Sequence, residues 1–166
     1  YIPRTDTYIE KSASINEEID RLRHNTTRSL YERNDVIIVA SVSCIYGLGL
    51  PESYFKGTIK VSVGDTLERN DLIKHLVMTQ YTRNDLVLER STFRARGDIL
   101  EIMPAYEKII TRIYFFGDEV EKIVRIDNLT GEILEAPESV MIYPAVHYIA
   151  YDENEDETIS MIRTEL

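Results

Sequence analysis

Several arginines crowd the middle of the chain, and their type and spacing suit the binding of acidic groups. They are Arg83, Arg90, Arg94 and Arg96. Arg94 and Arg96 lie two residues apart in a predicted strand, so their side chains project from one face, and Arg112 begins a strand that could lie beside them. A planar guanidinium pairs with the carboxylates of a protein partner or with phosphates. A solvated sheet face that binds nothing is the alternative interpretation.

The opening segment, residues 1–11, combines aromatic and charged side chains. As an extended, proline-containing strand it displays Tyr1 and Tyr8 beside Arg4 and Lys11. Aromatic rings stack on nucleic-acid bases for about 1–3 kcal/mol each, and basic groups hold phosphates, which together suit a clamp on single-stranded nucleic acid. An ordinary edge strand is the alternative for the same residues.

Motifs for enzymatic chemistry are absent from the sequence. No Gly-x-x-x-x-Gly-Lys-Ser/Thr phosphate loop occurs, and the Gly47-Leu48-Gly49 loop lacks its lysine, so this chain is not expected to hydrolyse ATP. The histidines have no zinc-site spacing and are predicted to bind no metal: His24, His75 and His147. Cys44 is interpreted as a small buried hydrophobe. We therefore predict no catalytic residue, cofactor or metal in this chain.

Composition and charge predict a globular, cytoplasmic protein without a membrane segment. Hydrophobic residues make up 43% and charged residues 29% of the 166 residues, and no apolar stretch approaches the roughly 20 residues of a membrane-spanning helix. The single cysteine suits a reducing compartment, and no signal peptide is expected. The net charge of −10 argues against nucleic acid, but acidic residues concentrate in 152–166, so another face can be neutral or basic.

The elements that carry these residues change in character along the chain. A helix is predicted from Ser14 to Asn34, because Ser14 and Glu17 form a capping box and apolar residues recur every three to four positions. The β-branched run 36–42 predicts a buried strand of a parallel α/β sheet, and a loop should follow over 43–51. The first part of the chain is therefore interpreted as part of an α/β domain.

After about Gly57, short strands and turns replace the long helix and the buried run. Asn70 is interpreted as the N-cap of a helix. Two hairpins are predicted, with strands 92–96 and 99–103 around Gly97-Asp98, and strands 112–116 and 119–126 around Gly117-Asp118. A third turn is expected at 128–131, and a helix after the acidic run 152–157. We expect a small α+β domain with a curved antiparallel sheet, whose inward residues include Phe93, Ile113 and Phe115.

Five segments resemble the UvrB family of bacterial nucleotide-excision repair, in the order in which that family has them. They are Tyr-Ile-Pro-Arg-Thr-Asp-Thr-Tyr-Ile-Glu-Lys at 1–11, Ile-Asn-Glu-Glu-Ile-Asp-Arg-Leu-Arg-His at 15–24, Asp-Val-Ile-Ile-Val-Ala-Ser-Val-Ser-Cys-Ile-Tyr-Gly-Leu-Gly at 35–49, Phe-Arg-Ala-Arg-Gly-Asp at 93–98 and Phe-Phe-Gly-Asp-Glu at 115–119. The resemblance covers residues 1–150, and the stretch 35–49 is very specific.

The resemblance implies a division of the chain into three parts. Residues 1–56 would belong to the first domain of a superfamily-2 helicase-like (RecA-like) protein with a parallel sheet, and would include the returning strand of a DNA-clamping β-hairpin. Residues 57–150 would form the small domain that binds UvrA, and 151–166 a helical segment that returns to the first domain.

The resemblance also assigns roles to single residues. The DNA-binding residues of the family would correspond to Tyr1, Tyr8, Glu10, Lys11 and Arg23. The residues that contact UvrA would correspond to Arg83, Arg94, Arg96 and Arg112. Tyr114 stands where many relatives have an acidic residue, so one polar contact with UvrA would differ here.

The function implied is that of a repair subunit that receives damaged DNA from UvrA, tests it with ATP and Mg²⁺, and recruits the nuclease UvrC in the bacterial cytoplasm. ATP binding would belong to other segments of the longer protein, since this chain has no phosphate loop. Two alternatives stay open: the UvrA-binding module of a transcription-repair coupling factor, and a stand-alone protein-interaction module without a DNA role.

Overall fold

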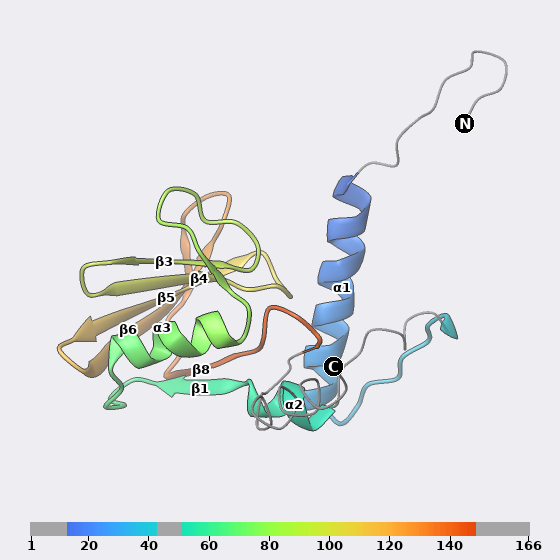
Figure 1. The fold of residues 1–166 in the computed structure, drawn as a ribbon, viewed down its shortest axis with the longest axis horizontal. Coiled ribbons are helices and arrows are strands. Elements are labelled where there is room, and N and C mark those ends of the chain that lie inside the picture. Colours follow the sequence, from blue (N-terminus) through green and yellow to red (C-terminus); the bar gives the residue numbers. More distant parts are fainter. Residues whose placement is uncertain (1–12, 43–50, 149–166) are drawn as a thin grey trace, which may run out of the picture.

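A computed structural model of the chain describes residues 13–42 and 51–148 (Figure 1). Its helices are α1 (Ala13–Glu32), α2 (Pro51–Lys56) and α3 (Arg69–Met78). The predicted helix from Ser14 to Asn34 is confirmed by α1 to within two residues at each end. The predictions for residues 1–11, Cys44 and the helix after the acidic run lie outside the described residues.

Two antiparallel arrangements of strands make up the rest of the fold. A six-stranded sheet has the order β2-β3-β4-β5-β6-β7, in which only β2 runs parallel to its neighbour, and β1 pairs with β8 in a separate two-stranded sheet. The strands are β1 (Ile59–Ser62), β2 (Thr82–Arg83), β3 (Thr92–Arg96), β4 (Ile99–Met103), β5 (Ile109–Phe116), β6 (Glu119–Asp127), β7 (Ile133–Glu135) and β8 (Ser139–Ile142). The predicted small α+β domain with an antiparallel sheet is therefore confirmed, and β5 begins three residues earlier than predicted.

The turns of the sheet follow the predicted chemistry. Gly97 and Gly117 have φ angles of 58° and 62°, in the left-handed region that a two-residue hairpin turn requires and that glycine adopts without strain. The third turn is held by the Asp127 carboxylate, which accepts hydrogen bonds from the amides of Leu129 and Thr130 before β7 begins. All three predicted turns are confirmed.

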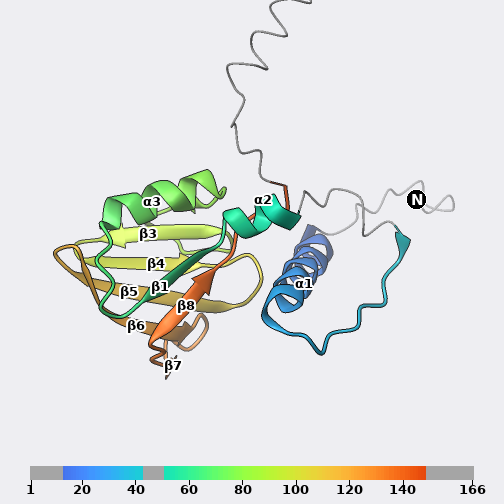
Figure 2. The ribbon, with the colours of Figure 1, turned by 90° about the horizontal axis from the view of Figure 1, so that it is seen from below.

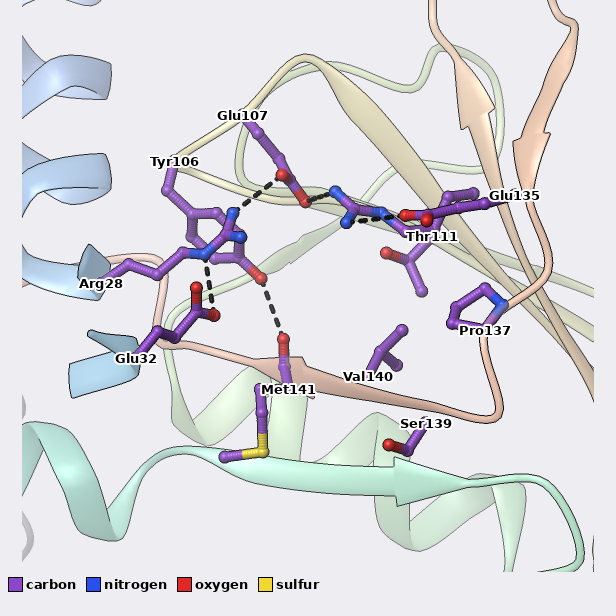
Figure 3. A pocket seen from close by; sticks show the side chains of 11 residues that line it. Arg28, Glu32, Tyr106, Glu107, Thr111, Glu135, Pro137, Ser139, Val140 and Met141 are labelled. Carbon is purple, nitrogen blue, oxygen red and sulfur yellow. Dashed lines mark hydrogen bonds and ion pairs between the residues drawn. The ribbon is translucent and has the colours of Figure 1, made fainter. Parts of the chain in front are cut away.

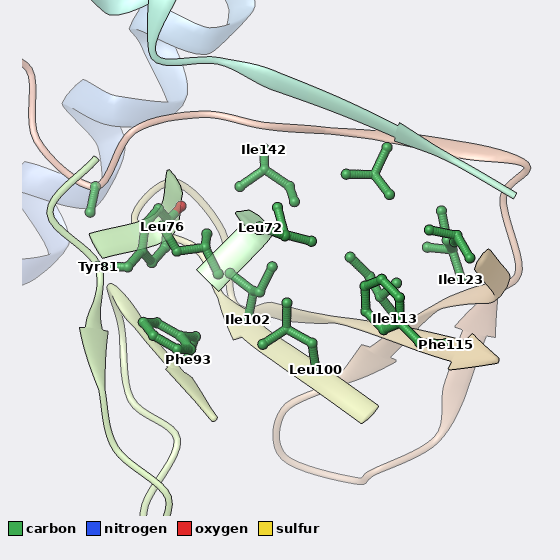
Figure 4. Packing of buried hydrophobic residues seen from close by; sticks show 13 residues of the cluster. Leu72, Leu76, Tyr81, Phe93, Leu100, Ile102, Ile113, Phe115, Ile123 and Ile142 are labelled. Atoms are coloured by element: carbon green, nitrogen blue, oxygen red, sulfur yellow. The ribbon is translucent and has the colours of Figure 1, made fainter. Parts of the chain in front are cut away.

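The hydrophobic core lies on one face of the six-stranded sheet. Phe93, Ile113 and Phe115 point into it, as predicted, and are buried. They pack against Leu72 and Leu76 of α3 and against residues of β1 and β8 (Figures 2 and 4). Since successive side chains of a strand point to opposite faces, Arg94 and Arg112 are left on the other face. One side of this sheet thus forms the main core, and the other carries these arginines beside a smaller buried cluster of Met103, Ile110, Val124 and Ile126.

The predicted buried strand at 36–42 is wrong for the described structure. This segment is not assigned to any strand, and residues Ile37 and Val39 are 92% and 96% exposed. A run of β-branched residues is buried only when neighbouring strands and helices cover both of its faces, and no described strand forms a sheet with this run. The described part of the chain therefore contains no parallel α/β sheet.

Two helix boundaries also differ from the predictions. Asn70 does not cap α3, because it lies in the first turn of that helix, and the N-cap position is taken by Glu68 without a side-chain hydrogen bond. Helix α2 is not predicted, although Pro51 at its first position and Glu52 in its first turn are residues that favour a helix start. No described helix is both long and apolar enough to cross a membrane.

Candidate partner-binding face

The side of the six-stranded sheet opposite the main core carries a row of charged residues that the strand register lines up. Arg94 of β3 lies opposite Glu101 of β4, and Glu101 lies opposite Arg112 of β5. We call this surface the arginine face, defined by Arg94, Arg96, Glu101, Arg112 and Tyr114, which alternation places on one side of the sheet. The strand of Arg112 does not lie directly beside that of Arg94, as the sequence suggested it could, because β4 lies between them and places the carboxylate of Glu101 between the two arginines.

Glu101 is the centre of this row, and its side chain is only 7% exposed. Its Oε1 atom accepts a hydrogen bond of 2.9 Å from Nε of Arg112 and forms an ion pair at 2.7 Å with Nη2 of the same arginine. Its Oε2 atom accepts a hydrogen bond from Nε of Arg94. Burial disfavours the charged carboxylate, but the hydrogen bonds from Arg94 and Arg112 outweigh it, and the pKa of Glu101 lies below its ordinary value. Glu101 is therefore ionised at neutral pH and binds both arginines.

Arg83 and Arg96 share a second acidic residue, Asp85. The Asp85 carboxylate pairs with Arg83 at 3.0 Å and accepts a hydrogen bond from the amide of Ala95, while its backbone oxygen accepts one from Arg96. The bond from the Ala95 amide and the guanidinium of Arg83 hold the pKa of Asp85 below its usual range. All four predicted contact arginines are therefore held in pairs by two acidic residues, which leaves an excess of positive charge.

The edge of the arginine face also offers apolar and hydroxyl groups. Tyr114 lies beside Arg112, whose Nη1 donates a hydrogen bond of 3.4 Å to the tyrosine hydroxyl oxygen. Phe116, two residues further on the same face of β5, is 80% exposed. An exposed aromatic ring beside arginines is the composition that protein interfaces favour.

Other residues singled out from the sequence lie elsewhere. Arg90 turns away from the arginine face, because its guanidinium bonds the backbone oxygen of Ala105 and the carboxylate of Asp20 on α1. Arg23 also lies on α1 and is half-buried. The structure does not place Arg23 relative to its predicted DNA-binding companions, because Tyr1, Tyr8, Glu10 and Lys11 lie outside the described residues.

A second glutamate that binds two arginines ties α1 to the sheet. Glu107 accepts a bond of 2.8 Å from Arg28 of α1 and pairs at 2.6 Å with Arg125 of β6 (Figure 3). Glu32 and Glu135 hold the other sides of these arginines, and the ring of Tyr106 lies 5.0 Å from the Arg28 guanidinium. The network borders a cavity of about 230 Å³. Because its carboxylates outnumber its guanidiniums, we interpret it as an ion-pair network that holds α1 against the sheet and not as an anion-binding site.

Replacing Glu107 with glutamine should lower the free energy of unfolding by about 1–3 kcal/mol, because a partly buried pair of arginines loses its shared charge-assisted acceptor. Chemical denaturation of the chain measures this. Glu121→Gln is the matched control, since Glu121 is exposed on β6. Equal stability of the two variants would show that the network of Glu107 does not stabilise the chain.

Two histidines that are far apart in the sequence meet at the other contact of α1. The rings of His24 and His147 stack with centroids 3.8 Å apart and planes inclined by 25°, and Thr27 lies 3.1 Å from Nε2 of His147. Burial lowers the pKa of His24 to about 3 and lowers that of His147, so both rings are neutral at physiological pH. The pair therefore packs α1 against the segment after β8.

With Asp20, these histidines offer ligand atoms that lie within 4.8 Å of one another. The geometry argues against a shared metal ion, because the lone pairs of imidazole lie in the ring plane and nearly parallel stacked rings do not direct them at one point. The Asp20 carboxylate is also bound by Arg90. The absence of a metal stays a prediction, now supported by geometry as well as by the spacing of the histidines.

Glu101, Asp85 and Phe116 were not among the site residues predicted from the sequence. Glu101 had a recognisable signal, since it is the only charged residue in the strand Ile-Leu-Glu-Ile-Met, and a lone carboxylate in an apolar strand needs a partner. Asp85 follows Arg83 by two residues, and Phe116 is the outward member of a Phe-Phe pair whose other member is buried.

The described structure is a small α+β domain whose main core lies on one face of its six-stranded sheet and whose other face carries Arg94 and Arg112 on either side of Glu101. Residues 59–148 match the family described as the UvrB interaction domain, and the chain belongs to this family.

The whole chain is also similar to longer proteins. It is 55% identical over 166 residues to the UvrABC system protein B of Gloeobacter violaceus and of Microcystis aeruginosa, and 54% identical to that of Synechocystis. All of this chain is covered in these comparisons, but only 24% or 25% of each relative. The chain thus spans about a quarter of the length of the curated relatives it matches.

Proposed function

We propose that this chain is the segment of a UvrB subunit that binds UvrA, and that the arginine face with Arg83 is the contact surface. The proposal rests on the way in which two acidic residues hold these arginines: Asp85 binds Arg83 and Arg96, and Glu101 binds Arg94 and Arg112. The domain that carries them belongs to the UvrB interaction family. Guanidiniums held in this way present a rigid set of donors to the carboxylates of a protein.

The direct test is a titration of the 166-residue chain with purified UvrA by calorimetry at two salt concentrations. The expected result is a saturable complex that weakens as salt rises, because charged groups at an interface are screened. Absence of binding to folded UvrA at low salt would contradict the proposal. The same titration with a transcription-repair coupling factor as competitor would show whether both proteins use one site on UvrA.

For the longer protein, we propose the role of the UvrB subunit in nucleotide-excision repair: verification of damage after loading by UvrA, with ATP and Mg²⁺, and recruitment of UvrC, in the bacterial cytoplasm. The similarity of the whole chain to UvrABC system protein B supports this role. It favours UvrB over the coupling-factor module and over a stand-alone module. ATP binding would use segments other than these 166 residues, which have no phosphate loop.

We also propose that Tyr1, Tyr8, Glu10, Lys11 and Arg23 contact DNA in the longer protein, on the strength of the resemblance of residues 1–24 to the UvrB family. Tyr8→Ala in the longer protein should loosen the final UvrB–DNA complex by about five- to a hundred-fold, since stacking on a base is worth about 1–3 kcal/mol.

The measurement for Tyr8 is the dissociation rate of damaged duplex from the UvrB-bound state, with a melting curve of the same preparation. The earlier, UvrA-dependent encounter with DNA should change less than the final complex. DNA retention equal to that of the unchanged protein, or a loss fully explained by unfolding, would remove Tyr8 from the binding residues.

A further inference from the structure

The position of Glu101 in the sheet determines how two of the contact arginines are oriented. Strand register places Arg94 and Arg112 on opposite sides of Glu101, so two guanidiniums flank one carboxylate. Without that carboxylate, two partly buried guanidiniums would share one site with no acidic group between them, and partly buried charges are costly when they have no partner. Glu101 therefore both balances their charge and sets the direction of each side chain.

The hydrogen bonds leave both guanidiniums with donors for a partner. Arg94 binds Glu101 through Nε, and Arg112 binds it through Nε and Nη2. A guanidinium has five N–H donors, so each arginine keeps N–H groups beyond those that Glu101 uses. The side chains of Arg94 and Arg112 are 22% and 31% exposed, so their outer parts reach solvent while Glu101 lies beneath them.

Holding an arginine before binding changes the cost of binding. A free arginine loses rotamer entropy when a partner immobilises it, whereas an arginine already fixed by a buried carboxylate has lost that entropy on folding. The arrangement also accounts for the low pKa of Glu101, because a protonated acid could not accept from both arginines while donating its own proton.

We infer that Glu101 is a positioning residue for UvrA binding, which acts through Arg94 and Arg112 and has no contact of its own with the partner. This inference rests on the proposed function. It implies that the partner offers carboxylates to the outer N–H groups of the two arginines. It also implies an unusual kinetic signature, since removing the charge of Glu101 makes the surface more positive and at the same time less ordered.

The variant Glu101→Gln tests the inference, because glutamine keeps the size of the side chain but can accept through only one oxygen. We expect affinity for UvrA to fall by about tenfold or more, with the loss in faster dissociation. The association rate at low salt should be unchanged or higher, because the excess of positive charge increases and steers an acidic partner. Surface-based binding kinetics, at a temperature well below the melting point of the variant, give both rates.

Glu135→Gln is the matched control, since Glu135 also pairs with an arginine, Arg125, but lies on β7 away from the arginine face. Its binding kinetics should equal those of the unchanged chain. If Glu101 had only a structural role, the variant Glu101→Gln would have a lower association rate, in proportion to its unfolded fraction, and an unchanged dissociation rate. That result would overturn the inference. Unchanged affinity of Glu101→Gln would overturn it as well.

A double-mutant cycle shows whether Glu101 acts through the arginines. In the background Arg94→Ala with Arg112→Ala, the substitution Glu101→Gln should change UvrA affinity by less than about twofold, and an undiminished effect would contradict the inference. If that background does not fold, the two rates of Glu101→Gln alone decide. If charge reversal of Arg83 and Arg96 abolishes UvrA binding but the separate variant Glu101→Gln binds normally, only the role of Glu101 is refuted. Normal binding after that reversal would refute the proposed contact surface itself.

Discussion

Reversing the charge of both Arg83 and Arg96 to glutamate should weaken UvrA binding by about 2–5 kcal/mol, or roughly thirty- to several-thousand-fold in affinity. Both side chains are exposed and share Asp85. After the reversal, the carboxylates of the partner would face two glutamates and Asp85 in place of two guanidiniums. Calorimetric titration of the variant with UvrA measures the loss.

Arg94 is a less clear target for the same experiment, although its reversal should cost a similar amount of binding. A glutamate at position 94 would oppose the buried carboxylate of Glu101, so lost binding would be mixed with lost stability. Arg83 and Arg96 have no such buried acidic neighbour, since the side chain of Asp85 is 44% exposed.

The control for this experiment makes the same change of net charge at other places. Arg33→Glu with Lys74→Glu reverses two exposed cations, and Arg33 pairs with Asp35 two residues later, as Arg83 does with Asp85. Lys74 lies on α3, on the core side of the sheet. The control variant should bind UvrA within about threefold of the unchanged chain. Similar affinities of the two double variants would mean that net charge, and not the arginine face, governs binding.

Replacing Phe93 with alanine should lower the free energy of unfolding of the domain by about 3–5 kcal/mol. Phe93 is fully buried, and it packs in the cluster where α3 meets β3 and β4 (Figure 4). The cavity left by the ring would border Leu76, Tyr81 and other core residues that cannot all move to fill it. Urea denaturation followed by circular dichroism measures the change.

Phe116→Ala is the matched control, because it removes the same ring from an exposed position of the same sheet. Its effect on stability should stay within about 0.5 kcal/mol. A loss of stability as large in Phe116→Ala as in Phe93→Ala would contradict the assignment of the two faces. Phe116→Ala is in addition informative for UvrA binding, because its ring lies at the edge of the arginine face.

Local patterns in the sequence were sufficient for several parts of this domain. Alternation along 92–96 assigns Phe93 and Arg94 to opposite faces before any partner strand is known, since the period of a strand is two residues. The Gly-Asp pairs mark both hairpin turns because few residues other than glycine adopt a positive φ without strain. The helix α1 follows from the spacing of its apolar residues. Each of these features depends on residues that are close in the chain.

For Arg94 and Arg112, the tertiary structure alone decided which acidic residue holds them. Strand register places Glu101 between Arg94 and Arg112, and a shift by one residue would have turned it into the core. Arg28 and Glu107 are 79 residues apart, and no local pattern links them. The apolar run 36–42 shows the reverse case, because its composition predicts burial but only neighbouring elements can bury it. Period and turn chemistry are properties of short segments, whereas burial and ion pairs between residues far apart in the chain depend on what the rest of the fold brings close.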